Sequence, residues 1–268
     1  MARTAEGGSI RSETSGTQCI HRSFAVVRML ASGSAEGEKL VDIAATLNLS
    51  HPTAHRILKA LETEGIVERA RGSRRYQLGS EAAWLGLAAF NRFPITRLAS
   101  PVLDRLVETV GDSVFLSVPS HNDSVYADRR FGAYPVQARR VAVGARRPLG
   151  VSVAGRTIMA YMKPERLEAV LRENADRYGD WRCTESQILC GAEGAREQGF
   201  LCSDSVVNSE RRVLAVPVRD IVGHPVAAIS VIAARPRLGG ERISRLVPLL
   251  REAARDISTA LHRQAIPG

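Results

Sequence analysis

The chain has 268 residues, 44% of them hydrophobic, which is enough for two domains with substantial cores. Its net charge of +9 favours a polyanionic partner without identifying one. No segment approaches the roughly 18–20 apolar residues of a membrane-spanning helix, and the polar N-terminus lacks a signal-peptide pattern, so we expect a cytoplasmic protein.

The first elements in chain order are a tail and a short helix. Residues 1–20 are polar and rich in Ser, Thr and Gly, which predicts a disordered tail. Residues 21–33 carry Phe24, Val27 and Leu30 and form the first predicted helix, which the glycines of the following segment end. The first folded domain is expected to span residues 21–79.

Residues 39–78 have the pattern of a winged helix-turn-helix. Apolar residues recur at helical spacing in residues 39–48. A second helix starts at Ser50, a good N-cap, with Pro52 in its first turn and Gly65 after its end. Residues 66–69 and 75–78 then read as two short strands joined by a basic, glycine-containing turn, which is the wing.

The outward face of the second helix is polar and can donate hydrogen bonds to DNA. We expect Thr53, His55 and Arg56 to read base edges, because a bidentate arginine–guanine pair discriminates by about 1–3 kcal/mol. The candidate contacts on this helix are Ser50, His51, Thr53, His55, Arg56 and Lys59. An ordinary solvated helix face is the alternative, and the helix before it and the hairpin after it favour DNA.

Three arginines of the predicted wing, Arg71, Arg74 and Arg75, are candidates for phosphate or minor-groove contacts. Alternatively, they only keep the tip of the hairpin soluble.

His51 and His55 have a spacing that can bind zinc, but no Glu follows His51 and no third ligand is evident. The four cysteines have no C-x-x-C spacing, so we expect reduced thiols and neither a metal nor a cofactor.

Residues 80–93 are expected to form a linker helix. This segment is largely apolar on every side, and such a helix normally has packing partners on both sides. We therefore expect it to join two domains and to contribute to a dimer interface.

Residues 94–264 alternate helical and strand patterns, which predicts an α+β sensor domain. Helices are expected at residues 96–110, 164–174, 185–198 and about 240–262, and strands at residues 113–118, 124–129, 136–141, 213–218 and 226–233.

Two segments of this domain could carry chemistry. Residues 150–156 allow three interpretations: a hydrolase nucleophile elbow at Ser152, an anion or carbonyl pocket near a helix N-terminus, or a plain loop that starts a helix. Residues 129–147 contain six arginines and no carboxylate. They would attract an acidic effector or a second stretch of DNA, or else they are solvated sheet edges; the arginines are Arg129, Arg130, Arg139, Arg140, Arg146 and Arg147.

Eight short motifs recur in a characteristic order and spacing, at residues 50–58, 65–69, 76–79, 143–149, 154–156, 197–200, 215–218 and 228–231. In these motifs, over residues 21–261, the chain resembles transcriptional regulators of the IclR family. The resemblance implies a GAF-like C-terminal domain that binds a small metabolite, often a carboxylate or an aromatic-pathway compound. It also implies dimers, often paired into tetramers, on palindromic operators.

Matching positions imply an effector pocket formed by Gly150, Val151, Ser152, Val153, Ala154, Asp204, Val213 and Ser230. The chain departs from its relatives at several of these positions. Gly150 replaces a usual His, Val213 replaces a frequent Cys, and residues 205–210 lack the usual acidic run. The pocket is therefore expected to be more apolar than usual, or to have lost its ligand.

Together these features predict a ligand-responsive, DNA-binding transcriptional regulator that is not an enzyme. The expected partners are double-stranded DNA, a small carboxylate or aromatic effector, and further copies of the chain in a homodimer or homotetramer; no membrane is expected. The regulated genes would serve catabolism of a small organic acid or aromatic compound. A hydrolase that uses Ser152 and an interaction module without DNA are the alternatives.

Overall fold

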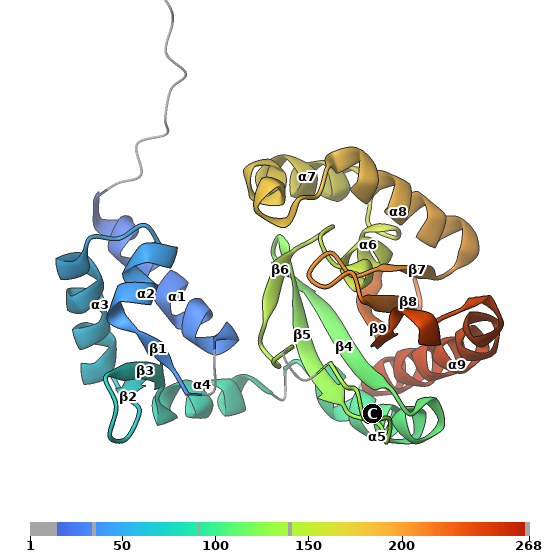
Figure 1. Ribbon diagram of the computed structural model, residues 1–268, viewed down its shortest axis with the longest axis horizontal. Helices are drawn as coiled ribbons and strands as arrows, with labels where there is room; N and C mark the ends of the chain where they lie inside the picture. Colours follow the sequence, from blue (N-terminus) through green and yellow to red (C-terminus); the bar gives the residue numbers. More distant parts are fainter. Residues whose placement is uncertain (1–14, 34–35, 91, 139–140, 266–268) are drawn as a thin grey trace, which may run out of the picture. The chain divides into compact units, whose positions relative to one another are not determined.

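The computed structural model describes residues 15–33, 36–90, 92–138 and 141–265. The chain divides into two compact units, residues 1–89 and residues 90–268 (Figure 1). Helix and strand are mixed in both, which confirms the predicted α+β class. Among the described residues, no helix is long and apolar enough to cross a membrane.

Three helices and a small antiparallel sheet form the core of the first unit. Its strands lie in the order β1-β3-β2. The elements are α1 (Ser15–Ser32), β1 (Glu38–Lys39), α2 (Leu40–Thr46), α3 (His51–Thr63), β2 (Val67–Arg69) and β3 (Arg75–Leu78). Apolar side chains from all three helices and from β2 and β3 form one core, and the buried ones are Val26, Leu30, Ile43, Ile57, Leu58, Val67 and Tyr76.

Helix α1 starts earlier than the sequence predicts. Residues 15–20, assigned to the disordered tail, are helical, and residues 1–14 of the predicted tail lie outside the described residues. Residues 17–20 contain neither Pro nor Gly, so the helix that buries Val26 continues backwards without a break. Lys39 is a second difference, because it pairs with Arg75 as part of β1 instead of starting a helix.

The turn between α2 and α3 needs a left-handed residue, and Asn48 supplies it with φ of 49°. Asparagine tolerates this region better than most residues. The Leu49 amide donates to the Ala44 carbonyl at 2.9 Å, which closes the turn and sets the direction in which α3 leaves.

Helix α4 (Ser80–Phe90) has no buried side chain. Its large apolar residues are exposed, with Trp84 at 61%, Leu85 at 56% and Leu87 at 64% of their full accessible area. The helix ends at Phe90, three residues before the predicted end of the linker.

The second unit is built on a six-stranded antiparallel sheet in the order β6-β5-β4-β9-β8-β7. Its strands are β4 (Ser113–Ser120), β5 (Asp123–Arg130), β6 (Arg146–Pro148), β7 (Leu201–Asp204), β8 (Arg211–Arg219) and β9 (Pro225–Ala234). Its helices are α5 (Ile95–Val110), α6 (Val153–Met159), α7 (Pro164–Tyr178), α8 (Glu185–Gln198) and α9 (Gly240–Ala265), with 3-10 turns η1 (Gly179–Trp181) and η2 (Arg235–Arg237).

The two faces of this sheet support two separate cores. Helices α5 and α9 pack on one face, while α6 lies on the other with α8 against it (Figure 1). Strand β9 shows the alternation: Ile229 and Val231 face the α5/α9 side, whereas Ala228 and Ile232 face the α6 side. The α6 side is where the sheet meets the loops that enclose a cavity.

The strand predicted at residues 136–141 is wrong. Residues 136–138 and 141 are irregular, and Arg139 and Arg140 lie outside the described residues. The position beside β5 is occupied by β6 instead. The segment's polar groups are satisfied elsewhere: the Ala138 amide donates to Ser113 Oγ at 2.8 Å, and the Gln137 side-chain amide donates to the Gly111 carbonyl at 3.2 Å.

Candidate DNA-binding surface and effector pocket

Helix α3 starts with a side-chain cap. Ser50 Oγ accepts the Thr53 amide at 3.4 Å and lies 2.8 Å from the Thr53 hydroxyl. No acidic residue lies in the first turn, so the positive end of the helix remains favourable for a phosphate. The cap fixes where the helix begins and therefore which of its side chains face outward.

The two faces of α3 differ sharply in burial. Ala54, Ile57 and Leu58 are buried in the core of the first unit. The candidate DNA contacts His51, His55, Arg56 and Lys59 are exposed, and Thr53 is half-buried. Four potential donors thus share one accessible surface. Within the described part of the chain, no group of three or more metal-binding side chains includes His51 and His55.

The predicted wing arginines fall into two kinds. Arg71 and Arg74 are exposed at the tip, where Gly72 adopts a φ of +70°. Arg75 is half-buried, and its guanidinium donates to the Gly37 carbonyl at 3.0 Å. The side chain of Arg75 therefore ties the wing to the segment before β1, which leaves Arg71 and Arg74 as the accessible cations of the tip.

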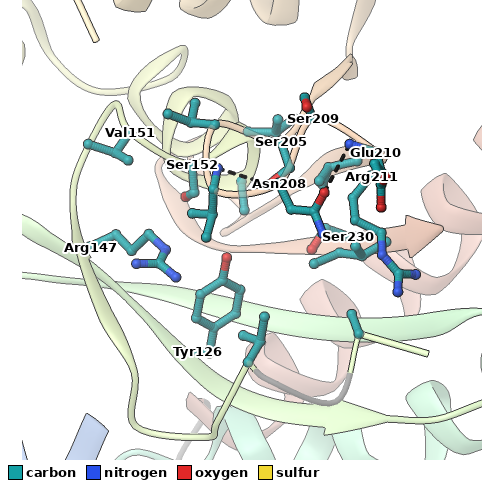
Figure 2. Close-up of a pocket in the computed structure, with 18 of the residues that line it drawn as sticks. Tyr126, Arg147, Val151, Ser152, Ser205, Asn208, Ser209, Glu210, Arg211 and Ser230 are labelled. Atoms are coloured by element: carbon teal, nitrogen blue, oxygen red, sulfur yellow. Dashed lines mark hydrogen bonds between the residues drawn. The ribbon is translucent and has the colours of Figure 1, made fainter. Parts of the chain in front are cut away.

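A cavity of about 1010 Å³ lies between the α6 side of the sheet and the surrounding loops (Figure 2). Its floor comes from β5, β8 and β9, and its walls come from the segment before α6 and the loop before β8. The lining residues are Tyr126, Gln137, Ala138, Val141, Arg147, Val151, Ser152, Val153, Ala154, Arg182, Ser205, Val206, Val207, Asn208, Ser209, Glu210, Arg211, Val213, Ser230 and Ile232.

Six of the eight predicted effector residues line this cavity: Val151, Ser152, Val153, Ala154, Val213 and Ser230. Gly150 does not line it. At its φ of +99°, a Cβ would lie 2.7 Å from Ile188 Cγ2, so Ile188 fills the place where a side chain would go.

Asp204 does not line the cavity either, because its carboxylate is committed to two arginines. Arg212 Nε lies 2.8 Å from one carboxylate oxygen, and a nitrogen of Arg235 lies 3.4 Å from the other. The hydrogen bond from Arg212 lowers the pKa of this carboxyl group. Asp204 therefore holds β7 against β8 in this structure.

Two of the three interpretations of residues 150–156 apply to Ser152: it starts a helix, and it lies in the wall of a pocket. Its hydroxyl oxygen accepts the Gly155 amide at 2.9 Å as the N-cap of α6, and it lies 3.3 Å from Ser124 Oγ. It also lines the cavity. Among the described lining residues there is no histidine that could act as its general base.

Tyr126 and Arg147 line the cavity, and neither is among the eight effector residues that the resemblance implied. The Tyr126 ring packs edge-on against Phe115, with centroids 5.5 Å apart. Burial raises the pKa of the Tyr126 hydroxyl, and the nearby Arg147 cation opposes part of that rise. The arginine-rich segment was a signal for Arg147; nothing in the sequence singled out Tyr126.

The lining of the cavity contains charged residues as well as apolar ones. Three arginines line it: Arg147, Arg182 and Arg211. They belong to three different segments of the chain, and only the fold brings them together.

Comparison with known proteins matches both units. The model described as "IclR helix-turn-helix domain" covers residues 20–71, and the model described as "Bacterial transcriptional regulator IclR C-terminal" covers residues 87–259. The glycerol operon regulatory protein of Streptomyces coelicolor is 31% identical over 250 residues, which cover 91% of this chain and 96% of that protein.

Solved structures share the fold. An IclR transcriptional regulator from Alicyclobacillus acidocaldarius has a TM-score of 0.72 at 23% identity, covering 91% of this chain and 98% of that one. An IclR homologue from Microbacterium hydrocarbonoxydans, solved with 4-hydroxybenzoate, has a TM-score of 0.69 at 22% identity, covering 91% and 99%. Since the two family models together match most of the chain, the protein belongs to the IclR family of DNA-binding transcriptional regulators.

Proposed function

We propose that the protein regulates transcription by placing α3 in the major groove of a palindromic operator. The observation that supports this most is the exposed face of α3. It presents His55, Arg56 and Lys59, and no acidic residue of the helix precedes Glu62. Such a face complements both base edges and phosphates.

The contacts divide into base readout and positioning. Thr53, His55 and Arg56 would read base edges, while Ser50, His51 and Lys59 would lie near the phosphate backbone. Arg71 and Arg74 at the tip of the wing would hold phosphates or enter the minor groove. Arg75 would orient the wing through its bond to Gly37 rather than contact DNA itself.

Helix α4 supports the proposal of a dimer. A helix with no buried side chain and an exposed Trp84, Leu85 and Leu87 gains stability when a second copy covers it. A dimer would present two α3 helices about 34 Å apart, or a multiple of it, which matches a palindromic site. Pairing of two dimers would give a tetramer.

The cavity of the second unit is the proposed effector site. Its volume of about 1010 Å³ is sufficient for a small organic acid or aromatic compound. The 4-hydroxybenzoate in the related Microbacterium structure supports this class of ligand. An effector can regulate only if it favours one arrangement of the DNA-binding units over another, and α4 is the proposed transmitter. The controlled genes would serve catabolism of such a compound.

Selection of binding sites from a random DNA pool tests this function. The wild-type protein should enrich a palindrome. Arg56→Ala should weaken specific binding by about 1–3 kcal/mol and relax one position in each half-site. Lys59→Ala is the control, since loss of a phosphate contact should weaken all sequences equally.

Two results would count against the proposal. If the wild-type protein enriches no sequence, it does not act as a site-specific regulator. If Arg56→Ala retains the wild-type preference at every position, Arg56 does not read a base.

A further inference from the structure

Arg147 is a fixed cation in the wall of the cavity without an acidic partner. Its guanidinium lies over the ring of Trp181, 4.4 Å from the centroid. The adjacent Arg146 is paired with Asp123 at 3.0 Å, whereas no carboxylate of the described residues forms an ion pair with Arg147. Stacking on Trp181 holds the guanidinium in place, and the donors that do not interact with the Tyr126 hydroxyl remain available to a ligand.

Two hydroxyl groups lie on the floor of the cavity, and the Tyr126 hydroxyl is the one close to this cation. Figure 2 shows the Tyr126 hydroxyl and the Arg147 guanidinium directed into the same part of the cavity. The raised pKa keeps the Tyr126 hydroxyl protonated, so it can donate. Ser230 Oγ is buried in the same cavity and has no hydrogen-bond partner among the described residues. An unpartnered buried hydroxyl is costly unless a ligand satisfies it.

The other lining residues determine which charge and which apolar surface the cavity favours in a ligand. Arg182 and Arg211 add positive charge, and Glu210 is the one carboxylate among the described lining residues. The short helix α6 offers no competing anion site, because Ser152 already caps it. Apolar surface comes from the valines of the α6 segment and from Val213 and Ile232.

We infer that Arg147, assisted by Tyr126 and Ser230, binds the anionic head group of the effector and determines its specificity. The planar guanidinium would hold a carboxylate through two hydrogen bonds, and the apolar body of the ligand would lie against Val213 and Ile232. Neither Arg147 nor Tyr126 is among the eight effector positions that the family resemblance implied. This inference rests on the proposed effector function of the cavity.

The test compares acids with neutral analogues of the same shape. Benzoate and 4-hydroxybenzoate are titrated against benzamide and 4-hydroxybenzamide by calorimetry. Fluorescence is followed in the full-length Trp84→Phe variant, whose one tryptophan, Trp181, lies against Arg147. The acids should bind about 10- to 100-fold more tightly than the amides and should change the Trp181 emission.

Arg147→Gln should abolish the preference for acids, Arg147→Lys should restore part of it, and Tyr126→Phe should weaken the acids about 3- to 10-fold. Arg219→Gln is the matched control, because Arg219 also stacks on an aromatic ring, that of Tyr161 at 4.6 Å, and does not line the cavity. Arg219→Gln should leave the preference for acids unchanged.

A wild-type protein that shows no acid-over-amide preference would overturn the inference, and so would a preference that persists in Arg147→Gln. Thermal melting of each variant shows whether it is folded. Salt-dependent DNA binding by the same proteins is measured separately. Intact DNA binding without acid preference would reject the role of Arg147 and leave the regulator function standing.

Discussion

At the scale of single residues, the buried carboxylate of Asp112 shows how charge stabilises the second unit. Asp112 is fully buried, and it accepts from Arg237 at 3.1 Å and from Arg242 at 2.6 Å. Arg237 also stacks on Tyr134, 3.5 Å from the ring centroid. The cluster joins the start of β4 to η2 and α9, which are distant in the sequence.

Asp112→Asn should lower the free energy of unfolding by about 3–5 kcal/mol, because it leaves two guanidinium groups without their counterion. Urea denaturation measures the loss. Asp256→Asn is the control, since the pair between Asp256 and Arg105 is exposed and 3.5 Å long and should contribute less than about 1 kcal/mol. Equal losses in the two variants would contradict the role of Asp112.

The four cysteines should differ in reactivity. Cys19 and Cys190 are exposed, Cys183 is buried, and burial raises the pKa of Cys202 to about 11. The thiolate is the reactive form, so at pH 8 Cys202 should remain almost entirely protonated and slow. A disulfide reagent should titrate two thiols rapidly in the native protein and four after unfolding. If the Cys202→Ser variant has fewer rapidly reacting thiols than the wild type, Cys202 is one of the fast thiols and the assignment is wrong.

Single residues also show how far the sequence predicts the site. Resemblance to the family pointed to Ser152 and Ser230 as effector positions, and both line the cavity. It misplaced Asp204, whose partners Arg212 and Arg235 become neighbours only through strand pairing and chain reversal. Arg147 and Tyr126 meet because β6 pairs with β5, and that pairing has no local signal in the sequence.

At the scale of elements, long periodic segments and the two short strands of the wing, β2 and β3, were predictable, whereas other short strands were not. Helix α8 has the predicted bounds of residues 185–198, and a capping box at Thr184 and Gln187 explains its sharp start. Strands β1, β6 and β7 have two to four residues each and were missed. Such strands are defined by their neighbours in the sheet rather than by their own hydrophobic pattern.

The wing gives a prediction at this scale. Arg71→Ala and Arg74→Ala should each reduce the slope of log K against log salt by about 0.9, because each removes one phosphate contact. Fluorescence anisotropy on one DNA duplex over a range of salt concentrations measures the slope.

Arg75→Ala should instead reduce the thermal stability of the first unit, since the Arg75 guanidinium donates to the Gly37 carbonyl. An unchanged slope in the Arg71, Arg74 double variant would exclude the wing from the DNA interface.

At the scale of the whole molecule, activity depends on how copies of the chain assemble. Trp84→Asp should shift the sedimentation coefficient towards that of a single chain, because it places a charge in the proposed α4 interface. Trp84→Phe keeps an apolar ring and should sediment as the wild type does. An unchanged profile for Trp84→Asp would assign the interface to another surface.

The measurement that tests the central claim most directly is fluorescence anisotropy with DNA from upstream of the protein's own gene. It is made at low and moderate salt, with excess random DNA as competitor. A sequence-specific regulator should bind tightly, resist the competitor and weaken steeply as salt rises. Binding that the competitor abolishes at both salt concentrations, with and without benzoate and 4-hydroxybenzoate, would contradict regulation through this site.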